Sequence, residues 1–130
     1  MRVTLYLYSS SVDNSIRFYV DELALFTISE NYGTGYCLLQ STLLPGFYLY
    51  LVDWCIHTEK QYALSLDVPD CDAEFRRMIS TTFTSGGRIA PDESGNVEVL
   101  EYPGGKVFQM ADPDNNVFAI YEHFKGEDES

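Results

Sequence analysis

The same order of predicted elements occurs twice along this chain of 130 residues. Each half begins with a strand in which apolar and polar residues alternate, continues with an amphipathic helix, and then gives three further strand-like runs. The halves repeat this pattern over about sixty residues each, without repeating the sequence itself. A repeat of this kind admits few architectures, and it predicts an α+β fold built from two βαβββ modules.

Residue periodicity places the elements of the first module. The run Val-Thr-Leu-Tyr-Leu-Tyr alternates with a period of two, and the next run has apolar residues at helical spacing behind a Ser or Asp cap. Gly and Pro then separate three short runs rich in aromatic or β-branched residues. We predict a strand over 3–8, a helix over 13–23, and strands over 26–30, 36–40 and 47–52.

The second module repeats this order from residue 61. Asp70 or Asp72 is placed to cap its helix, and Gly86-Gly87 follows the end of that helix. The apolar stripe of the helix consists of Phe75, Met78, Ile79 and Thr82. Strands are predicted over 61–68, 88–90, 97–102, 107–111 and 117–122, and the division of the chain between 88 and 102 stays open.

The last two strands are joined by the turn Asp112-Pro-Asp-Asn-Asn116. Pro113 presets φ for a turn, and Asp and Asn side chains bond to nearby backbone groups and tolerate positive φ. This composition between two apolar runs predicts a β-hairpin.

Three segments in this order resemble the vicinal oxygen chelate superfamily, which contains glyoxalase I, extradiol dioxygenases, fosfomycin-resistance enzymes and bleomycin-resistance proteins. They are the helix start Asp13-Asn-Ser-Ile-Arg-Phe-Tyr19, the pair Gly86-Gly87, and the turn Asp112–Asn116. The resemblance implies a cup-shaped mixed sheet with helices on its outer face. It covers nearly the whole chain, and fold alone does not specify activity.

The length fits a single domain with one core. We expect this domain to cover 1–126, with module one over 1–58, module two over 59–126, and an acidic tail over 127–130. The first apolar run is too short and too alternating for a secretion signal, and no segment approaches a membrane span. We therefore predict a cytoplasmic protein that does not interact with membranes.

Charge limits the partners of this protein. Twenty acidic and eight basic residues give a net charge of −12, which repels a phosphate backbone and favours cations. We therefore expect no nucleic-acid partner. Cys37, Cys55 and Cys71 are odd in number and lack the spacing of a disulfide framework or a zinc ribbon, so we expect each to be a small buried residue.

The resemblance also implies where a metal ion would bind, on the inner faces of about four strands. These places fall at Thr4, Tyr50, Gln61 and Ala119, and of these only Gln61 has a side chain that commonly serves there. A divalent ion needs several converging oxygen, nitrogen or sulfur donors, so we expect no metal and no cofactor. His57 and Glu59 precede Gln61 and are assigned to a polar connector.

Glu122 and His123 follow the last strand and resemble metal ligands by composition. Glu122 shares parity with Phe118 and Ile120, on the side that faces the helices, and we expect it to emerge into solvent at the strand end.

Strand parity predicts which side chains line the cup. Residues on the side away from the helices are phenols, small residues and an amide, which suit a flat or amphipathic organic ligand. The candidate ligand-binding residues are Tyr6, Tyr48, Tyr50, Trp54, Gln61 and Tyr121. Two alternatives stay open: Trp54 plugs the core or a dimer interface, and the tyrosines fill the interior without a usable cavity.

The sequence is compatible with three alternative functions. The first is a metal-free protein, similar in character to the bleomycin-resistance branch, that sequesters an aromatic or cationic small molecule without catalytic residues. The second is a metal-dependent lyase or isomerase related to glyoxalase I, and the third is a non-catalytic scaffold. A homodimer is expected, because chains of this superfamily often complete each other's cavities and symmetric pairs are the commonest oligomers.

Overall fold

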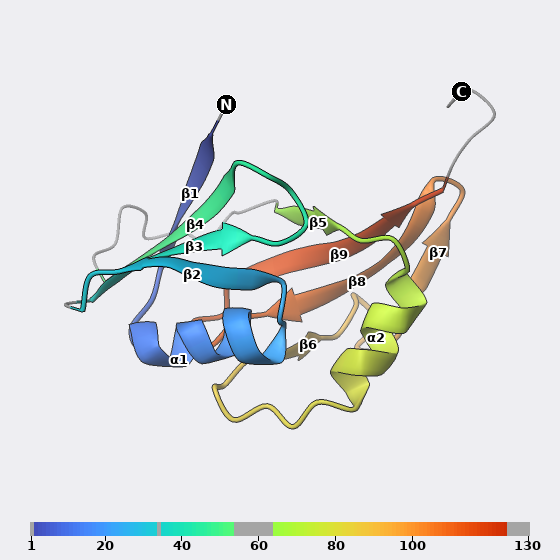
Figure 1. Ribbon diagram of the computed structural model, residues 1–130. Helices are drawn as coiled ribbons and strands as arrows, with labels where there is room; N and C mark the ends of the chain where they lie inside the picture. Colours follow the sequence, from blue (N-terminus) through green and yellow to red (C-terminus); the bar gives the residue numbers. More distant parts are fainter. Residues whose placement is uncertain (1, 34, 54–63, 125–130) are drawn as a thin grey trace.

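The computed structural model describes residues 2–33, 35–53 and 64–124. They form two mixed sheets, and a helical segment lies beside each sheet (Figure 1). Sheet A has the strand order β1-β4-β3-β2, and sheet B has the order β5-β9-β8-β6, with β7 also paired to β8. In both sheets the first strand of the module pairs in parallel with the last. The predicted α+β fold class is confirmed.

The strands of sheet A are β1 (Val3–Tyr8), β2 (Phe26–Asn31), β3 (Tyr36–Ser41) and β4 (Phe47–Val52). Those of sheet B are β5 (Ser65–Asp67), β6 (Arg88–Ala90), β7 (Leu100–Tyr102), β8 (Gly105–Ala111) and β9 (Val117–His123). Both β6 and β7 pair with β8, one with each end of it. The uncertain region from 88 to 102 is therefore one edge strand that is interrupted over residues 91–99.

The first helical segment consists of α1 (Val12–Ile16) and the π-helix η1 (Arg17–Glu22). Ser11 caps it, because its side chain accepts a hydrogen bond from the backbone N–H of Asn14 at 3.3 Å. Phe18 and Tyr19 are fully buried. The sequence predicted one continuous helix here, and the structure begins it as α-helix and continues it as π-helix.

The second helix, α2 (Cys71–Ile79), is capped by Asp70, whose side chain accepts a hydrogen bond from Ala73 N. Met78 is buried as predicted, but Ile79 is 58 % exposed and Thr82 lies beyond the helix. The predicted apolar stripe was therefore too long. The chain leaves the helix early because residues just beyond it bond to Glu22 of the first module, as described below.

Alternation along the strands sorts the side chains between two faces. The face towards the helices holds the buried apolar residues, including Leu7, Cys37, Leu39, Leu49 and Leu51 of sheet A and Leu66, Phe108, Met110, Phe118 and Ile120 of sheet B. These side chains belong to one core cluster with Phe18, Tyr19 and Met78 of the helical segments. Val3 has the same strand parity as Leu7 but is 52 % exposed, because it begins the edge strand.

Asp112, the first residue of the closing turn, is buried and connects the two modules. Its carboxylate accepts hydrogen bonds from the Tyr19 hydroxyl at 2.8 Å, from Asn116 Nδ2 at 2.8 Å, and from the backbone N–H groups of Asp114 and Asn116 at 2.9 and 2.8 Å. Burial raises the pKa of Asp112, and these hydrogen bonds oppose that effect. One carboxylate thus shapes the turn and holds the first helical segment.

The same turn also contacts the strand end of the first module. The carboxylate of Asp114 accepts hydrogen bonds from the backbone N–H of Ser10 at 3.1 Å, and Asn116 Nδ2 donates to the carbonyl of Tyr8 at 3.2 Å. The turn therefore fixes the position of β9 relative to β1.

A second connection between the modules centres on Glu22. Its carboxylate accepts hydrogen bonds from Thr84 N at 2.8 Å and from Ser85 N and Oγ at 3.2 and 2.5 Å. Arg77 of α2 donates to the carbonyl of Leu23 at 2.6 Å. Gly87 follows, and a Cβ there would collide with the ring of Phe18. This close approach explains why glycine is needed at that position.

The Asp112 network predicts a large effect of Asp112→Asn on stability. The amide keeps the shape of the side chain but places an NH2 group among hydrogen-bond donors, so buried partners lose their acceptor. We expect the free energy of unfolding, measured by urea denaturation, to fall by about 2–4 kcal/mol. The exposed Asp21→Asn removes the same charge and should change it by less than about 0.5 kcal/mol. Equal effects of the two substitutions would contradict this role of Asp112.

The burial of the Tyr19 hydroxyl predicts that the protein loses stability at alkaline pH. Complete burial, and then the nearby Asp112 carboxylate, raise the pKa of Tyr19 well above its usual value. The stabilising contribution of the neutral phenol is complete below pH 10 and is lost above it, because unfolded Tyr19 ionises there and native Tyr19 does not. The stability difference between the wild type and Tyr19→Phe should therefore shrink by about 1.4 kcal/mol per pH unit above pH 10. A constant difference in urea melts between pH 8 and 11 would refute this assignment.

Candidate functional site

The faces of the two sheets that point away from the helices form the candidate site. We call them open face A and open face B. The register of β1, β3 and β4 brings together on open face A the residues Thr4, Tyr6, Tyr8, Tyr36, Leu38, Gln40, Tyr48, Tyr50 and Val52. Aromatic rings dominate this surface, and Leu38 and Val52 are buried on the same face.

Tyr50 lies at the centre of a cluster of four tyrosine rings on open face A. The centroid of its ring is 5.2 Å from that of Tyr6, 6.1 Å from Tyr32 and 6.4 Å from Tyr36, and the three pairs are tilted at 48–57°. Loss of solvation, and then the neighbouring phenols of Tyr32, Tyr6 and Tyr36, raise the pKa of Tyr50. The Tyr50 phenol is therefore a neutral hydrogen-bonding group beside broad ring surfaces at physiological pH.

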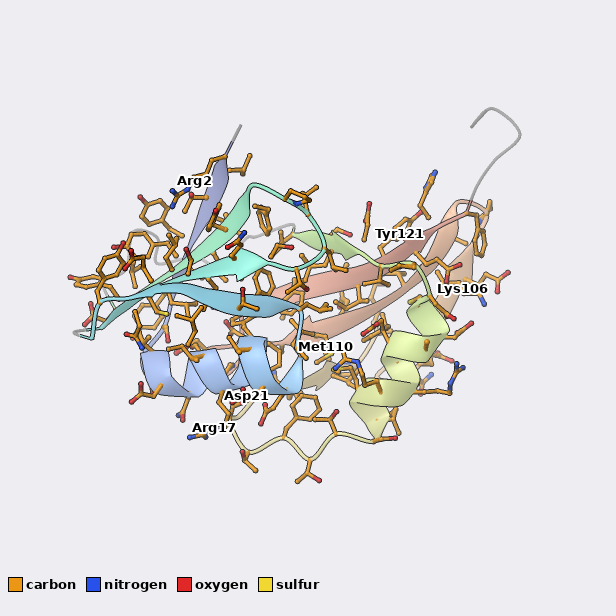
Figure 2. The ribbon with its side chains drawn as sticks, in the orientation of Figure 1. Arg2, Arg17, Asp21, Lys106, Met110 and Tyr121 are labelled. Atoms are coloured by element: carbon orange, nitrogen blue, oxygen red, sulfur yellow. The ribbon has the colours of Figure 1, made fainter. Side chains whose placement is uncertain are left out.

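Open face A already holds one cation of this chain. The guanidinium carbon of Arg2 lies 4.2 Å from the ring centroid of Tyr48, which is a cation–π geometry. Figure 2 shows Arg2 close to the start of β1. A tyrosine of this face is therefore placed to accept a positive charge over its ring.

Open face B carries Tyr121. The register across the sheet aligns Asp67, Tyr121, Val107 and Leu100 in one row. The Tyr121 ring covers Gly105, where a Cβ would lie only 2.7 Å from the phenol oxygen. Figure 2 shows Tyr121 on β9, on the side away from α2. The small residue at 105 therefore leaves room for the ring to lie on the sheet.

A hollow of about 390 Å³ lies on open face B beside the interrupted edge strand. We call it the β6–β7 hollow. Its lining residues are Ala90, Asp92, Glu93, Ser94, Glu98, Leu100, Tyr102, Val107, Phe108 and Gln109. Three of them are acidic and none is basic, so the hollow has the electrostatic character of a cation site. Its volume lies within the range of small-molecule pockets.

The structure brings together only some of the predicted ligand-binding residues. Tyr6, Tyr48 and Tyr50 share open face A, whereas Tyr121 lies on the other sheet. Trp54 and Gln61 lie outside the described residues. Their role in ligand binding stays a prediction. Sequence reasoning missed Tyr32 and Tyr36 as members of the cluster.

Comparisons of sequence identify no relative: no protein-family model matches this chain, and no curated protein matches it. Solved structures do match it. The antibiotic-binding protein TnmS3 from Streptomyces sp. CB03234 has a TM-score of 0.73 at 19 % identity, with 95 % of this chain and 96 % of that chain covered. A bleomycin resistance determinant encoded on the transposon Tn5 has a TM-score of 0.66 at 20 % identity, with 96 % and 99 % covered.

A third similar structure is a glyoxalase/bleomycin resistance protein/dioxygenase from Alicyclobacillus acidocaldarius, with a TM-score of 0.66 at 16 % identity over 96 % of this chain and 92 % of that one. This chain has the vicinal oxygen chelate fold. The resemblance inferred from three short segments is therefore confirmed at the level of the fold, over nearly the whole chain.

The donors at the metal positions expected for the vicinal oxygen chelate fold do not suit a divalent ion. Thr4 and Tyr50 lie on open face A and Ala119 on open face B, and none of the three offers a carboxylate or an imidazole. The described residues contain no group of three or more His, Cys, Asp or Glu side chains placed to hold a metal. Gln61, His57 and Glu59 lie outside the described part of the chain.

Glu122 has a different role from the one expected. Its side chain lies on the helix side of the sheet, as strand parity predicted, but it does not simply emerge into solvent. Its Oε1 accepts a hydrogen bond from Cys71 N at 2.9 Å, so a carboxylate sits at the positive N-terminus of α2. Glu122 thus stabilises the helix.

Within the described residues, no helix is long and apolar enough to cross a membrane.

Proposed function

We propose that this protein binds a small aromatic or cationic molecule and sequesters it without transforming it. The observation that carries the proposal is the tyrosine cluster on open face A, where the rings of Tyr6, Tyr32 and Tyr36 surround Tyr50. Tyrosine supplies a large contact area with only two rotatable side-chain bonds, and its hydroxyl adds a hydrogen bond. Such a surface suits a flat ligand.

The net charge of the protein and its similarity to two solved structures support the same function. The net charge of −12 attracts cations, and the position of Arg2 over Tyr48 is one example of a cation held on this face. Two proteins with the same fold are named for antibiotic binding and bleomycin resistance. The donors at the expected metal positions favour binding over metal-assisted catalysis.

We place this binding in the cytoplasm. Cys37 and Cys71 are both buried and unpaired among the described residues, and burial raises the pKa of each thiol to about 11. Unpaired thiols of this kind suit a reducing compartment.

The binding proposal predicts that N-methylacridinium, a flat aromatic cation, binds the wild-type protein in fluorescence-polarisation titrations. Tyr6 is 41 % exposed, so Tyr6→Ala should retain the fold while weakening binding about tenfold, in line with the loss of an aromatic contact. Ile79→Ala removes an exposed apolar side chain from α2 and should leave the affinity unchanged. Circular dichroism checks the fold of both variants.

Other outcomes would favour the alternatives. If the protein purified without chelator contains about one divalent ion per chain and its melting temperature falls in EDTA, the metal-dependent lyase or isomerase gains support. If no thermal shift occurs with N-methylacridinium or with a wider panel of aromatic compounds, the scaffold does. Either result would count against sequestration.

We further propose that two copies of this chain form a homodimer. Open face A leaves Tyr6 exposed, and Ile28 and Tyr32 are exposed in and beside β2. A second copy that covers part of these side chains would remove apolar surface from water. Light scattering at micromolar concentration should give about twice the chain mass of 14.8 kDa. A mass of one chain across this range would contradict the dimer.

A further inference from the structure

Arg2 is held at the edge of open face A by the first hydrogen bond of β1. Val3 pairs with Phe47, and the backbone N–H of Val3 donates to the carbonyl of Gly46 at 2.7 Å. Arg2 therefore lies beside Gly46, which has no side chain, and the next residue on this face is Tyr48. Because residues two apart share one face of a strand, the Arg2 side chain extends along open face A and meets the Tyr48 ring.

The guanidinium group of Arg2 contacts an aromatic ring in a chain that is rich in carboxylates. Its central carbon lies 4.2 Å from the centroid of the Tyr48 ring. The basic residues in ion pairs among the described residues are Arg77 and Lys106, and Arg2 is not among them. The chain has twenty acidic and eight basic residues, yet the partner of this cation is a phenol ring. The face of Tyr48 is thus a place that holds a positive group by a cation–π contact.

Tyr48 borders the tyrosine cluster of open face A. It precedes Tyr50, the centre of that cluster, by two residues on the same face of β4, which corresponds to about 7 Å along a strand. The neighbouring strand repeats this spacing, because Thr4 pairs with Tyr48 and Tyr6 pairs with Tyr50. A flat molecule that lies on the rings around Tyr50 can therefore place a positive group over the ring of Tyr48.

Arg2 and the positive group of such a ligand would compete for the same ring. Two positive groups on one ring repel each other, so a ligand cation has to displace the guanidinium. Arg2 is exposed and precedes the first strand, so its side chain can turn into solvent. A site that is occupied by its own chain binds a ligand more weakly, in proportion to the fraction of molecules in which it is open. A neutral ring can bind the cluster while Arg2 stays over Tyr48.

We propose that the ring of Tyr48 is the cation subsite of open face A and that Arg2 occupies this subsite in the free protein as an intramolecular competitor. This inference deepens the proposed function and rests on it. Arg2 then sets the affinity that the positive group of a ligand has to exceed in order to bind.

The test compares two substitutions that remove the same charge. Arg2→Gln keeps a long polar side chain at the subsite, and Arg76→Gln removes a positive charge from α2. Arg76 is exposed, and α2 and β1 lie at opposite ends of the molecule in Figure 1. Fluorescence titration gives the affinities of N-methylacridinium, which carries a permanent positive charge, and of acridine, which has a similar shape and is neutral at pH 8.

We expect Arg2→Gln to strengthen N-methylacridinium binding about three- to sixfold, because an exposed cation–π contact keeps the subsite occupied in most molecules. The affinity for acridine should change by less than about twofold, since a neutral ring does not need the cation subsite. Arg76→Gln should change either affinity by less than about twofold, because distant exposed charges are screened by salt. Unchanged melting temperatures check that both variants fold as the wild type does.

Tyr48→Leu tests whether Arg2 acts through the ring. Leucine keeps an apolar side chain on β4 and removes the aromatic face. In this background Arg2→Gln should change N-methylacridinium binding by less than about twofold, because the subsite is gone. The double variant should also bind this cation about two- to fivefold more weakly than Arg2→Gln alone. Circular dichroism and thermal melts check the fold of the variants that carry Tyr48→Leu.

Three outcomes would overturn the inference and leave the proposed function in place. Equal strengthening by Arg2→Gln and Arg76→Gln would assign the effect to the net charge of the protein. If the wild type binds and Arg2→Gln does not strengthen the binding of the cation, Arg2 is not a competitor. If Arg2→Gln still strengthens binding in the Tyr48→Leu background, Tyr48 is not the subsite. If neither the wild type nor Arg2→Gln binds either ligand, the proposed function itself fails, and the inference fails with it.

Discussion

The arrangement of the two modules depends on the buried carboxylate of Asp112. It accepts hydrogen bonds from the closing turn and from Tyr19 of the first helical segment. Because a buried charge is costly unless its hydrogen bonds are complete, the turn and the helix are positioned together. The neighbouring Asp114 and Asn116 extend this connection to the end of β1, and Glu22 makes a second one to the loop after α2. The orientation of both open faces follows from these contacts.

Much of this fold could be predicted from local chemistry. Alternation identified β1, Ser11 and Asp70 were placed to cap helices, and the Asp-Pro-Asp-Asn-Asn turn indicated a hairpin. The missed features depend on contacts between distant residues. The early end of α2 follows from the binding of Thr84 and Ser85 to Glu22, and Glu122 accepts a hydrogen bond from a helix 51 residues earlier in the chain. No local pattern contains that information.

The residues of the candidate site also fall into those that the sequence predicted and those that it did not. Strand parity placed Tyr6, Tyr48 and Tyr50 on one face, because a period of two fixes the face of every residue in a strand. Tyr36 joins them through the register of β3, which the same parity rule would have given if applied to that strand. Tyr32 lies at the turn after β2, where the period ends. The β6–β7 hollow was not predictable, since it requires the edge strand to break over a segment whose division the sequence left open.

We propose that the open faces of the sheets are the ligand-binding surfaces. Nuclear magnetic resonance of protein with isotope-labelled tyrosine rings tests it directly, because each ring reports on its own surroundings. On titration with N-methylacridinium, we expect the signals of Tyr6, Tyr48, Tyr50 and Tyr102 to shift and the signal of the buried Tyr19 to stay in place. Saturable binding that leaves the signals of Tyr6, Tyr48, Tyr50 and Tyr102 unperturbed would contradict this assignment of the binding surface.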